Sequence, residues 1–290
     1  MTASPEPGAG QSGLVTDRST GGAVDIPANR SWWERHGSGV VVAVSRLAVL
    51  AVALAAWQVM SGPVLDPHLV SSPSAVWDRL VQWSGDGTLW PNTWVTVQEI
   101  VIGYVIGAAA GVVFGFAIAA QARLSRVLDP FIIALYSIPK VALAPLFIVW
   151  FGIGLEMKVV LAAATVFFLV FLNTAAGVRE IDQALLDAVR LMGGRRRDLL
   201  LKVTLPGSMT GVITGLRVSV PYALIGAVIG ELVATNRGLG YLINDAASNF
   251  DTAGVFAALV VLSVIAAVLN VGVNALARRT NRWKPLDGGE

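Results

Sequence analysis

The chain has 290 residues, of which 55% are hydrophobic and only 14% are charged, and its mean hydropathy is +0.68. A soluble domain carries about 25% charged residues, so this composition excludes most soluble enzymes, a disordered protein and a nucleic-acid binder. The net charge is only +2, and the chain has no cysteine and two histidines, so no metal site or thiolate nucleophile is expected. We therefore expect a membrane protein without a cofactor.

The two ends of the chain differ from the apolar middle. Residues 1–39 are rich in Gly, Pro, Ser and Thr and show no apolar periodicity, which predicts a disordered tail. Residues 278–290 are predicted to form a second, shorter tail. Residues 40–277 then form the predicted transmembrane domain.

A membrane helix needs about 20 mostly apolar residues to cross a hydrocarbon core about 30 Å thick. The segment between the first two apolar stretches is long enough for a short amphipathic helix after Ser74. Six stretches qualify as spans: Val40–Met60, Thr93–Ala120, Pro130–Phe151, Val159–Val178, Gly207–Val233 and Thr252–Ala277. The sequence thus predicts an all-α membrane protein with six transmembrane helices.

Lysine and arginine are distributed very unequally between alternate loops. Sixteen of the 21 lie before or at the start of the first span or after the second, fourth and sixth, and only three lie in the loops of the other side. Because cytoplasmic loops carry the excess of Lys and Arg, both termini are predicted to be cytoplasmic.

Glycines recur every four residues in the second span, at positions 103, 107, 111 and 115. A shorter series follows in the fifth span at positions 207, 211 and 215, with a further pair at 226 and 230. Small residues at this spacing let another backbone approach closely. General glycine enrichment of membrane helices explains single glycines better than it explains four in register, so we predict tight helix packing along these faces.

Charged residues inside spans are expensive in lipid and point to function. Glu99 lies one turn before Gly103, so we expect it to face protein. Glu231 ends the fifth span, and Arg217 lies deeper in it. Glu99 and Glu231 are candidates for the substrate pathway. For all three residues the alternative is an internal ion pair or a side chain that extends to the head groups.

Lys140 is the third candidate for the substrate pathway, and the same alternatives apply to it. Pro139 precedes it and Pro145 follows, which predicts a break in the third helix that frees carbonyl groups. A lone cation here would suit an anionic substrate, but Glu99 could cancel its charge. The charges by themselves therefore do not select a substrate.

The loop from Arg179 to Lys202 is polar and regular. Gly193-Gly194 interrupts it and predicts a helix–Gly–helix unit. The apolar positions 184, 185, 188, 191 and 192 have the spacing of one helix face. Such a unit suits either a groove on a soluble partner or the lipid surface.

The same loop resembles the EAA loop of permease subunits of bacterial ABC importers. The family pattern is Glu-Ala-Ala, three residues, Gly, nine residues, Ile-x-Leu-Pro. At identical spacing this chain has Asp187-Ala188-Val189, Gly193 and Val203-Thr204-Leu205-Pro206. The departures, Asp for Glu, Val for Ala and Val for Ile, keep the charge or the apolar character.

The resemblance covers about residues 41–277, with the family core at 93–277. Pro139 to Leu146, and Glu231 with Gly238-Leu239-Gly240, are similar to the branch that includes nitrate, taurine and alkanesulfonate permeases. The Pro139 to Leu146 segment also resembles permeases for thiamine-pyrimidine or riboflavin. The implied function is translocation of a small solute, most simply a sulfonate, taurine or nitrate type of anion, across a bacterial plasma membrane.

No Gly-Lys-Ser/Thr occurs, so the chain lacks a phosphate-binding loop of its own. The resemblance implies two cytoplasmic ATPase subunits, a second permease copy in a homodimer, and an external solute-binding protein. It also implies that the ATPase-coupling residues are Asp187, Ala188, Val189, Gly193, Leu205 and Pro206. An ion-coupled secondary transporter is the alternative from another class, although no internal repeat supports it.

Overall fold

The computed structural model describes residues 32–62, 64, 66–233 and 235–280, and the regular structure of these residues is helical. α1 (Trp32–Met60) begins inside the segment predicted to be a disordered tail, and residues 1–31 and 281–290 lie outside the described residues. α1 also runs through the boundary between two compact units, residues 1–53 and 54–290.

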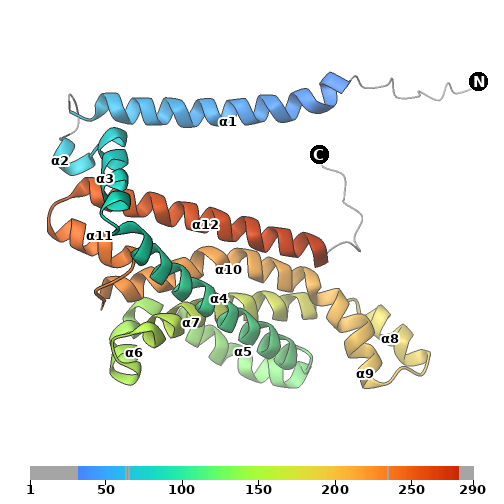
Figure 1. Ribbon diagram of the computed structural model, residues 1–290. Coiled ribbons are helices and arrows are strands. Elements are labelled where there is room, and N and C mark those ends of the chain that lie inside the picture. Colours follow the sequence, from blue (N-terminus) through green and yellow to red (C-terminus); the bar gives the residue numbers. More distant parts are fainter. Residues whose placement is uncertain (1–31, 63, 65, 234, 281–290) are drawn as a thin grey trace, which may run out of the picture. The chain divides into compact units, whose positions relative to one another are not determined.

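The second unit holds the rest of the fold (Figure 1). Its helices are α2 (Pro67–Val70), α3 (Pro73–Gly85), α4 (Leu89–Ala119), α5 (Ala122–Ser137), α6 (Ala144–Phe151), α7 (Leu155–Arg179), α8 (Gln183–Leu191), α9 (Arg196–Asp198), α10 (Leu205–Val233), α11 (Leu239–Ser248) and α12 (Thr252–Thr280). A 3₁₀ turn at Lys140–Leu143 precedes α6, and a π-helical turn at Leu199–Thr204 precedes α10.

Helices occur at all six predicted spans, but not all of them meet the criteria of a membrane span. Among the described residues, four helical segments are long and apolar enough, and a fifth is added if a bent pair counts as one span. The apolar part of α1, Val44–Met60, is shorter. The predicted amphipathic helix is confirmed as α3, which starts at Pro73 because the Ser72 hydroxyl accepts a hydrogen bond from the Ala75 N–H.

α7 is the central helix of the unit, since both α4 and α10 pack along it. The four glycines of α4 are buried against it. A Cβ atom placed on Gly111 would lie 2.8 Å from the Phe167 carbonyl oxygen and 2.8 Å from the Val170 Cβ. The predicted close packing is therefore confirmed, and the partner is a helix of the same chain.

The glycines of α10 contact α7 from another side. Gly215 lies against Val170 and Asn173, and Gly226 lies against Ala162. Gly207 differs, because it is exposed and its nearest neighbour is the Ile181 side chain. Most of the predicted series thus brings the α10 backbone onto α7.

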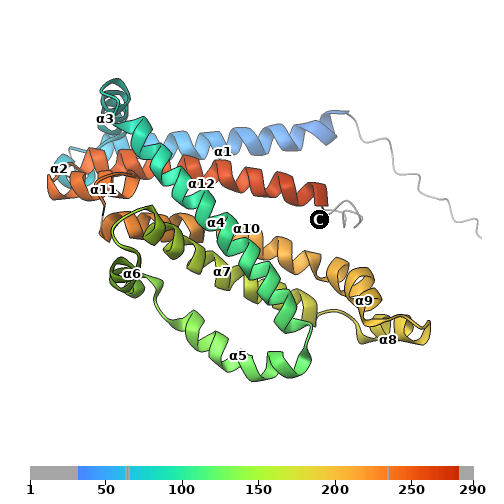
Figure 2. The ribbon, with the colours of Figure 1, turned by 60° about the horizontal axis from the view of Figure 1, so that its bottom comes forward.

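The predicted break in the third span is also present. α5 ends at Ser137, and the segment that contains α6 continues at an angle of 81° to it (Figure 2). Pro139 and Pro145 flank the 3₁₀ turn. Since proline removes a backbone donor and restricts the residue before it, a straight helix cannot pass through this sequence.

The two ends of the α4–α7–α10 bundle carry different elements. α8 and α9 lie at one end, whereas α3, α6 and α11 lie at the other (Figures 1 and 2). α11 and α3 both contact α12, which completes the second end. The predicted loop unit and the charged positions 99 and 231 are therefore at opposite ends of the bundle.

We predict that Gly111→Ala lowers the free energy of unfolding by about 1–3 kcal/mol, because the new methyl group meets backbone atoms of α7. Gly272→Ala is the matched control: this glycine is also helical, but a Cβ atom there has no neighbour within 4 Å. It should leave stability unchanged or raise it by up to about 1 kcal/mol. Thermal unfolding in detergent measures both, and equal effects would contradict the packing.

Candidate functional site

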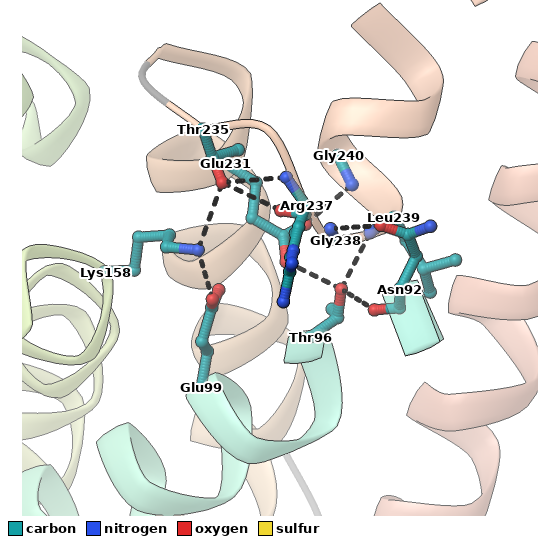
Figure 3. A network of polar contacts seen from close by, with 10 residues as sticks. All are labelled: Asn92, Thr96, Glu99, Lys158, Glu231, Thr235, Arg237, Gly238, Leu239 and Gly240. Atoms are coloured by element: carbon teal, nitrogen blue, oxygen red, sulfur yellow. Dashed lines mark hydrogen bonds and ion pairs between the residues drawn. The ribbon is translucent and has the colours of Figure 1, made fainter. Parts of the chain in front are cut away.

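A buried polar network lies where α4, α7, α10 and the start of α11 meet (Figure 3). The Glu99 side chain is fully buried and forms an ion pair with Lys158 of α7. The Lys158 ammonium also lies 3.4 Å from the Thr235 hydroxyl, to which it donates. The prediction that Glu99 faces protein is confirmed, and its partner is a lysine one turn inside α7.

Glu231, also buried, fixes the turn between α10 and α11 (Figure 3). One carboxylate oxygen accepts a hydrogen bond from the Thr96 hydroxyl at 2.6 Å, and the other accepts one from the Gly240 N–H at 2.6 Å. The Leu239 N–H donates to the Thr96 hydroxyl at 2.8 Å. The carboxylate therefore lies at the N-terminus of α11, where helix N–H groups favour a negative charge.

The geometry of the turn explains why the sequence pattern has a glycine at position 238. Its φ of +112° is a conformation that side chains rarely adopt, and the Glu231 carboxylate occupies the space that a Cβ would need. Its N–H donates to the Asn92 side-chain oxygen at 2.8 Å. Asn92 and Thr96, which sequence reasoning missed, thus join α4 to the turn.

A pocket of about 390 Å³ opens beside this network. Gln98, Glu99 and Lys158 line one part of it, and Thr235 and Arg237 line another. Since the Glu99 and Lys158 charges are paired, the cation that remains exposed at the pocket is Arg237. Val95, Ile153 and Leu155 also line the pocket, so its lining is mixed, and its two buried charges are paired with each other.

The Lys140 side chain caps the C-terminus of α5. Its ammonium donates to the carbonyl oxygens of Leu135, Tyr136 and Ile138 at 3.2, 2.6 and 2.8 Å. It also lies 4.7 Å from the centre of the Phe168 ring, within the range of a cation–π interaction. The lysine thus satisfies carbonyl groups that the broken helix leaves without donors.

The loop unit predicted from Gly193-Gly194 is present as α8, the glycine turn and α9. Asp182 caps α8, since its carboxylate accepts from the Ala184 N–H at 2.8 Å. At the other end the Gly193 N–H donates to Arg190 and the Gly194 N–H donates to Val189, with φ of +79° at Gly193. This is a Schellman motif, which requires a residue that tolerates positive φ.

α8 presents its apolar side chains to solvent. Leu185, Leu191 and Met192 are 57%, 88% and 77% exposed. Asp187 pairs with Arg190 at 2.6 Å on the exposed surface, and the predicted coupling residues Ala188, Leu205 and Pro206 are exposed, while Val189 is half-buried. The structure thus gathers most of the predicted coupling residues at one end of the molecule, and nothing in the described residues covers the apolar side of α8.

A second cross-link, also missed by sequence reasoning, joins α5 to α7 near α8. One guanidinium nitrogen of Arg179 lies 2.5 Å from the Asp129 carboxylate and 2.7 Å from the Ser125 hydroxyl. A large pocket of about 1570 Å³ is lined by this arginine together with Leu186 of α8 and Leu200 of the π-helical turn. The contact ties the end of α7, which leads into α8, to the first half of the broken span.

We predict that Lys158→Met destabilises the fold by about 3–5 kcal/mol, because it leaves the Glu99 carboxylate buried without a cation. The double variant Glu99→Gln/Lys158→Met should be less destabilised than the sum of the single variants. Thermal unfolding of the four proteins in the cycle measures the coupling. As a control, Arg79→Gln breaks the half-exposed pair with Asp251 and should cost less than about 1 kcal/mol.

The sequence from α4 to α12 is similar to that of known transport proteins. Residues 103–282 match the family described as binding-protein-dependent transport system inner membrane component. The taurine transport system permease protein TauC of Escherichia coli is 30% identical over 249 residues, 84% of this chain and 90% of TauC. The riboflavin transport system permease protein RibX of Chloroflexus aurantiacus is 35% identical over 238 residues, 81% of this chain and 88% of RibX.

A solved structure supports the fold. A chain of the MetNI methionine ABC transporter in an inward-facing conformation superposes with a TM-score of 0.59 at 20% identity, over 73% of this chain and 100% of that chain. The family match runs from the first glycine of α4 to the end of α12, and the similarity to permeases extends over more than four fifths of the sequence. The chain belongs to the family of binding-protein-dependent transport system inner membrane components and is a multi-pass permease subunit of an ABC transporter.

Proposed function

We propose that this permease belongs to an importer that moves a small anion of the sulfonate, taurine or nitrate type, delivered by an external binding protein. Two copies of the chain and two cytoplasmic ATPase subunits complete the transporter in this proposal. The family match and the similarity to TauC support it. The chain itself acts as the transport subunit, and ATP is hydrolysed by the separate subunits.

The observation that carries the proposal is the exposed apolar side of α8. A short helix with 88% of Leu191 and 77% of Met192 in solvent is unfavourable unless a partner covers it. An amphipathic helix that inserts its apolar side into a groove is a common mode of recognition. We therefore assign α8 to the cleft of an ATPase subunit. Asp187, whose ion pair with Arg190 is exposed, can pair there with a residue of the ATPase instead.

The mechanism follows from how α8 is connected. Its N-terminal side leaves α7 after Arg179, and its C-terminal side leads through α9 and the π-helical turn into α10. Since glycine contacts hold α7 and α10 together, displacement of α8 moves both helices as one body. When two ATPase subunits close, the two α8 helices approach, and the permease copies rock between inward-open and outward-open states.

The orientation is part of the same proposal. α8 must face the cytoplasm to reach an ATPase, which agrees with the Lys and Arg excess in its loop. With α1 and the bent α5–α6 pair each counted as a span, the chain crosses the membrane six times and both termini are cytoplasmic. The α3–α11 end, with the Glu231 network, then faces the external binding protein.

Two alternatives keep the same fold. A thiamine-pyrimidine or riboflavin type of solute is the first, and the similarity to RibX favours it to a comparable degree. An ion-coupled carrier is the second, but its buried carboxylates would have to exchange ions. Glu99 is paired with Lys158, and Glu231 is bonded to Thr96 and Gly240, so neither carboxylate is free for that task.

We predict that Gly193→Pro abolishes co-purification of the ATPase subunit and reduces ATP-driven uptake at least tenfold. Proline cannot adopt the φ of +79° found here and lacks the N–H that donates to Arg190, so the end of α8 is rebuilt. Asp187→Arg should weaken ATPase binding without that backbone change. Affinity purification from the native host, followed by identification of P-loop proteins, measures both.

Gly87→Pro is the matched control, because Gly87 also has φ of +79° but lies between α3 and α4, at the other end of the bundle. It should retain the ATPase. If wild-type protein purifies alone and stable, or if all three variants keep full uptake, the importer assignment is wrong.

A further inference from the structure

One exposed face of α10 carries a charged residue in the middle of the helix. Its exposed positions include Thr210, Thr214 and Arg217, which follow one another at helical spacing. By contrast, one face of α12 exposes the valines at positions 260, 264, 268 and 271. The Thr214 hydroxyl donates to the Thr210 carbonyl oxygen at 2.9 Å, so the group on this face that requires water or a polar ligand is the guanidinium of Arg217.

Arg217 lies in the middle of this face. Twelve residues separate it from the start of α10 and sixteen from its end, so its Cα is roughly 18 Å and 24 Å from the two ends at 1.5 Å per residue. Its side chain is exposed, and among the residues that the structure describes none forms an ion pair or a side-chain hydrogen bond with it. A guanidinium at this depth must face a water-filled cavity or a counter-ion.

A second copy of the chain offers no evident carboxylate as that counter-ion. Within the described spans, Glu99 and Asp129 are held by Lys158 and Arg179, and the bonds of Glu231 at the α11 turn are described above. The remaining acid, at position 156, is in the first turn of α7. This first turn of α7 packs beside Gly230 of α10, which contacts Lys158. Gly230 is about 20 Å from Arg217 along α10, so the acid at position 156 is too far away to pair with it.

Pro221 adds a second, independent feature at the same level. It is inside α10 and has no N–H, so the carbonyl group of Arg217, four residues earlier, lacks its usual helical donor. In a membrane, a backbone acceptor of this kind is tolerated where it lines a cavity or meets another polar group. Arg217 therefore supplies a donor, its guanidinium, and an acceptor, its own carbonyl oxygen, near the middle of the membrane.

We propose that Arg217 lines the translocation pathway and binds the anionic group of the solute, a sulfonate or a comparable oxyanion. The inference rests on the proposed importer and adds to it the residue that selects the charge of the solute. A guanidinium presents its N–H groups in a fork that matches two oxygens of such an anion. The freed carbonyl accepts a hydrogen bond from an amino or hydroxyl group elsewhere on the same solute.

Because the chain has no cysteine, single cysteines test the proposal without knowledge of the solute. Thr214→Cys, one turn from Arg217, is placed in the complex with its ATPase and treated with two reagents. One is anionic sulfonatoethyl methanethiosulfonate, and the other is cationic trimethylammonioethyl methanethiosulfonate. Relative to a free thiol in water, we expect the anionic reagent to be favoured by about tenfold or more, as a focused positive field predicts.

Adding Arg217→Gln should remove this preference, and Arg217→Lys should restore part of it. Val264→Cys on α12 is the control for a lipid-facing site and should react with neither reagent. The proposal is overturned if Thr214→Cys is as unreactive as Val264→Cys, or if Arg217→Gln leaves the ratio of the two rates unchanged.

Uptake separates this proposal from the importer assignment. In cells, Arg217→Gln should reduce uptake of taurine, ethanesulfonate or nitrate at least tenfold, while ATPase co-purification stays at the wild-type level. If the wild-type complex assembles but carries only riboflavin or an uncharged pyrimidine, the role of Arg217 is wrong and the importer stands. If no ATPase binds, the importer assignment falls, whereas the labelling ratios still decide whether Arg217 attracts anions.

Discussion

The close approach of two helices to α7 is the constraint on which the rest of the unit depends. Lipid is as apolar as leucine, so helices in a membrane gain little from burying apolar surface and associate instead through tight packing of small residues. Gly103 to Gly115 of α4 and Gly211 to Gly230 of α10 supply that packing along almost the full length of α7. Bulkier residues would separate the backbones and with them every polar contact between the helices.

The buried charges are a consequence of this packing. Glu99 reaches Lys158 because the glycine face of α4 ends beside the first turn of α7. Glu231 reaches Thr96 because α10 is held on the same helix, and the turn to α11 then closes over the carboxylate. Removing an ion pair from water is costly, so the Glu99–Lys158 pair depends on the close packing that holds its two groups in contact.

Sequence reasoning found features whose cause is local and missed those that depend on a distant partner. The glycine spacing indicated a contact face, the prolines beside Lys140 indicated a break, and Gly193 indicated a turn; each depends on backbone geometry within a few residues. Lys158 lies just outside the predicted span, which begins at Val159 where the apolar run starts, although α7 starts at Leu155. The capping of α5 by Lys140 depends on a fold-back that no periodicity reveals.

Arg217 illustrates why the candidate site was only partly predictable. From the sequence it is one of several charges in a span, and an internal ion pair explains it as well as a pathway does. The positions of the acidic residues decide between these explanations. In the structure Glu99 is paired with Lys158 and Asp129 with Arg179. Glu231 is hydrogen-bonded at the turn to α11. Because these acidic residues already have partners, Arg217 has no acidic partner within the described spans, and this favours a role in binding a ligand. The same packing that neutralises the network at one end of the bundle thus makes Arg217 available to a solute in its middle.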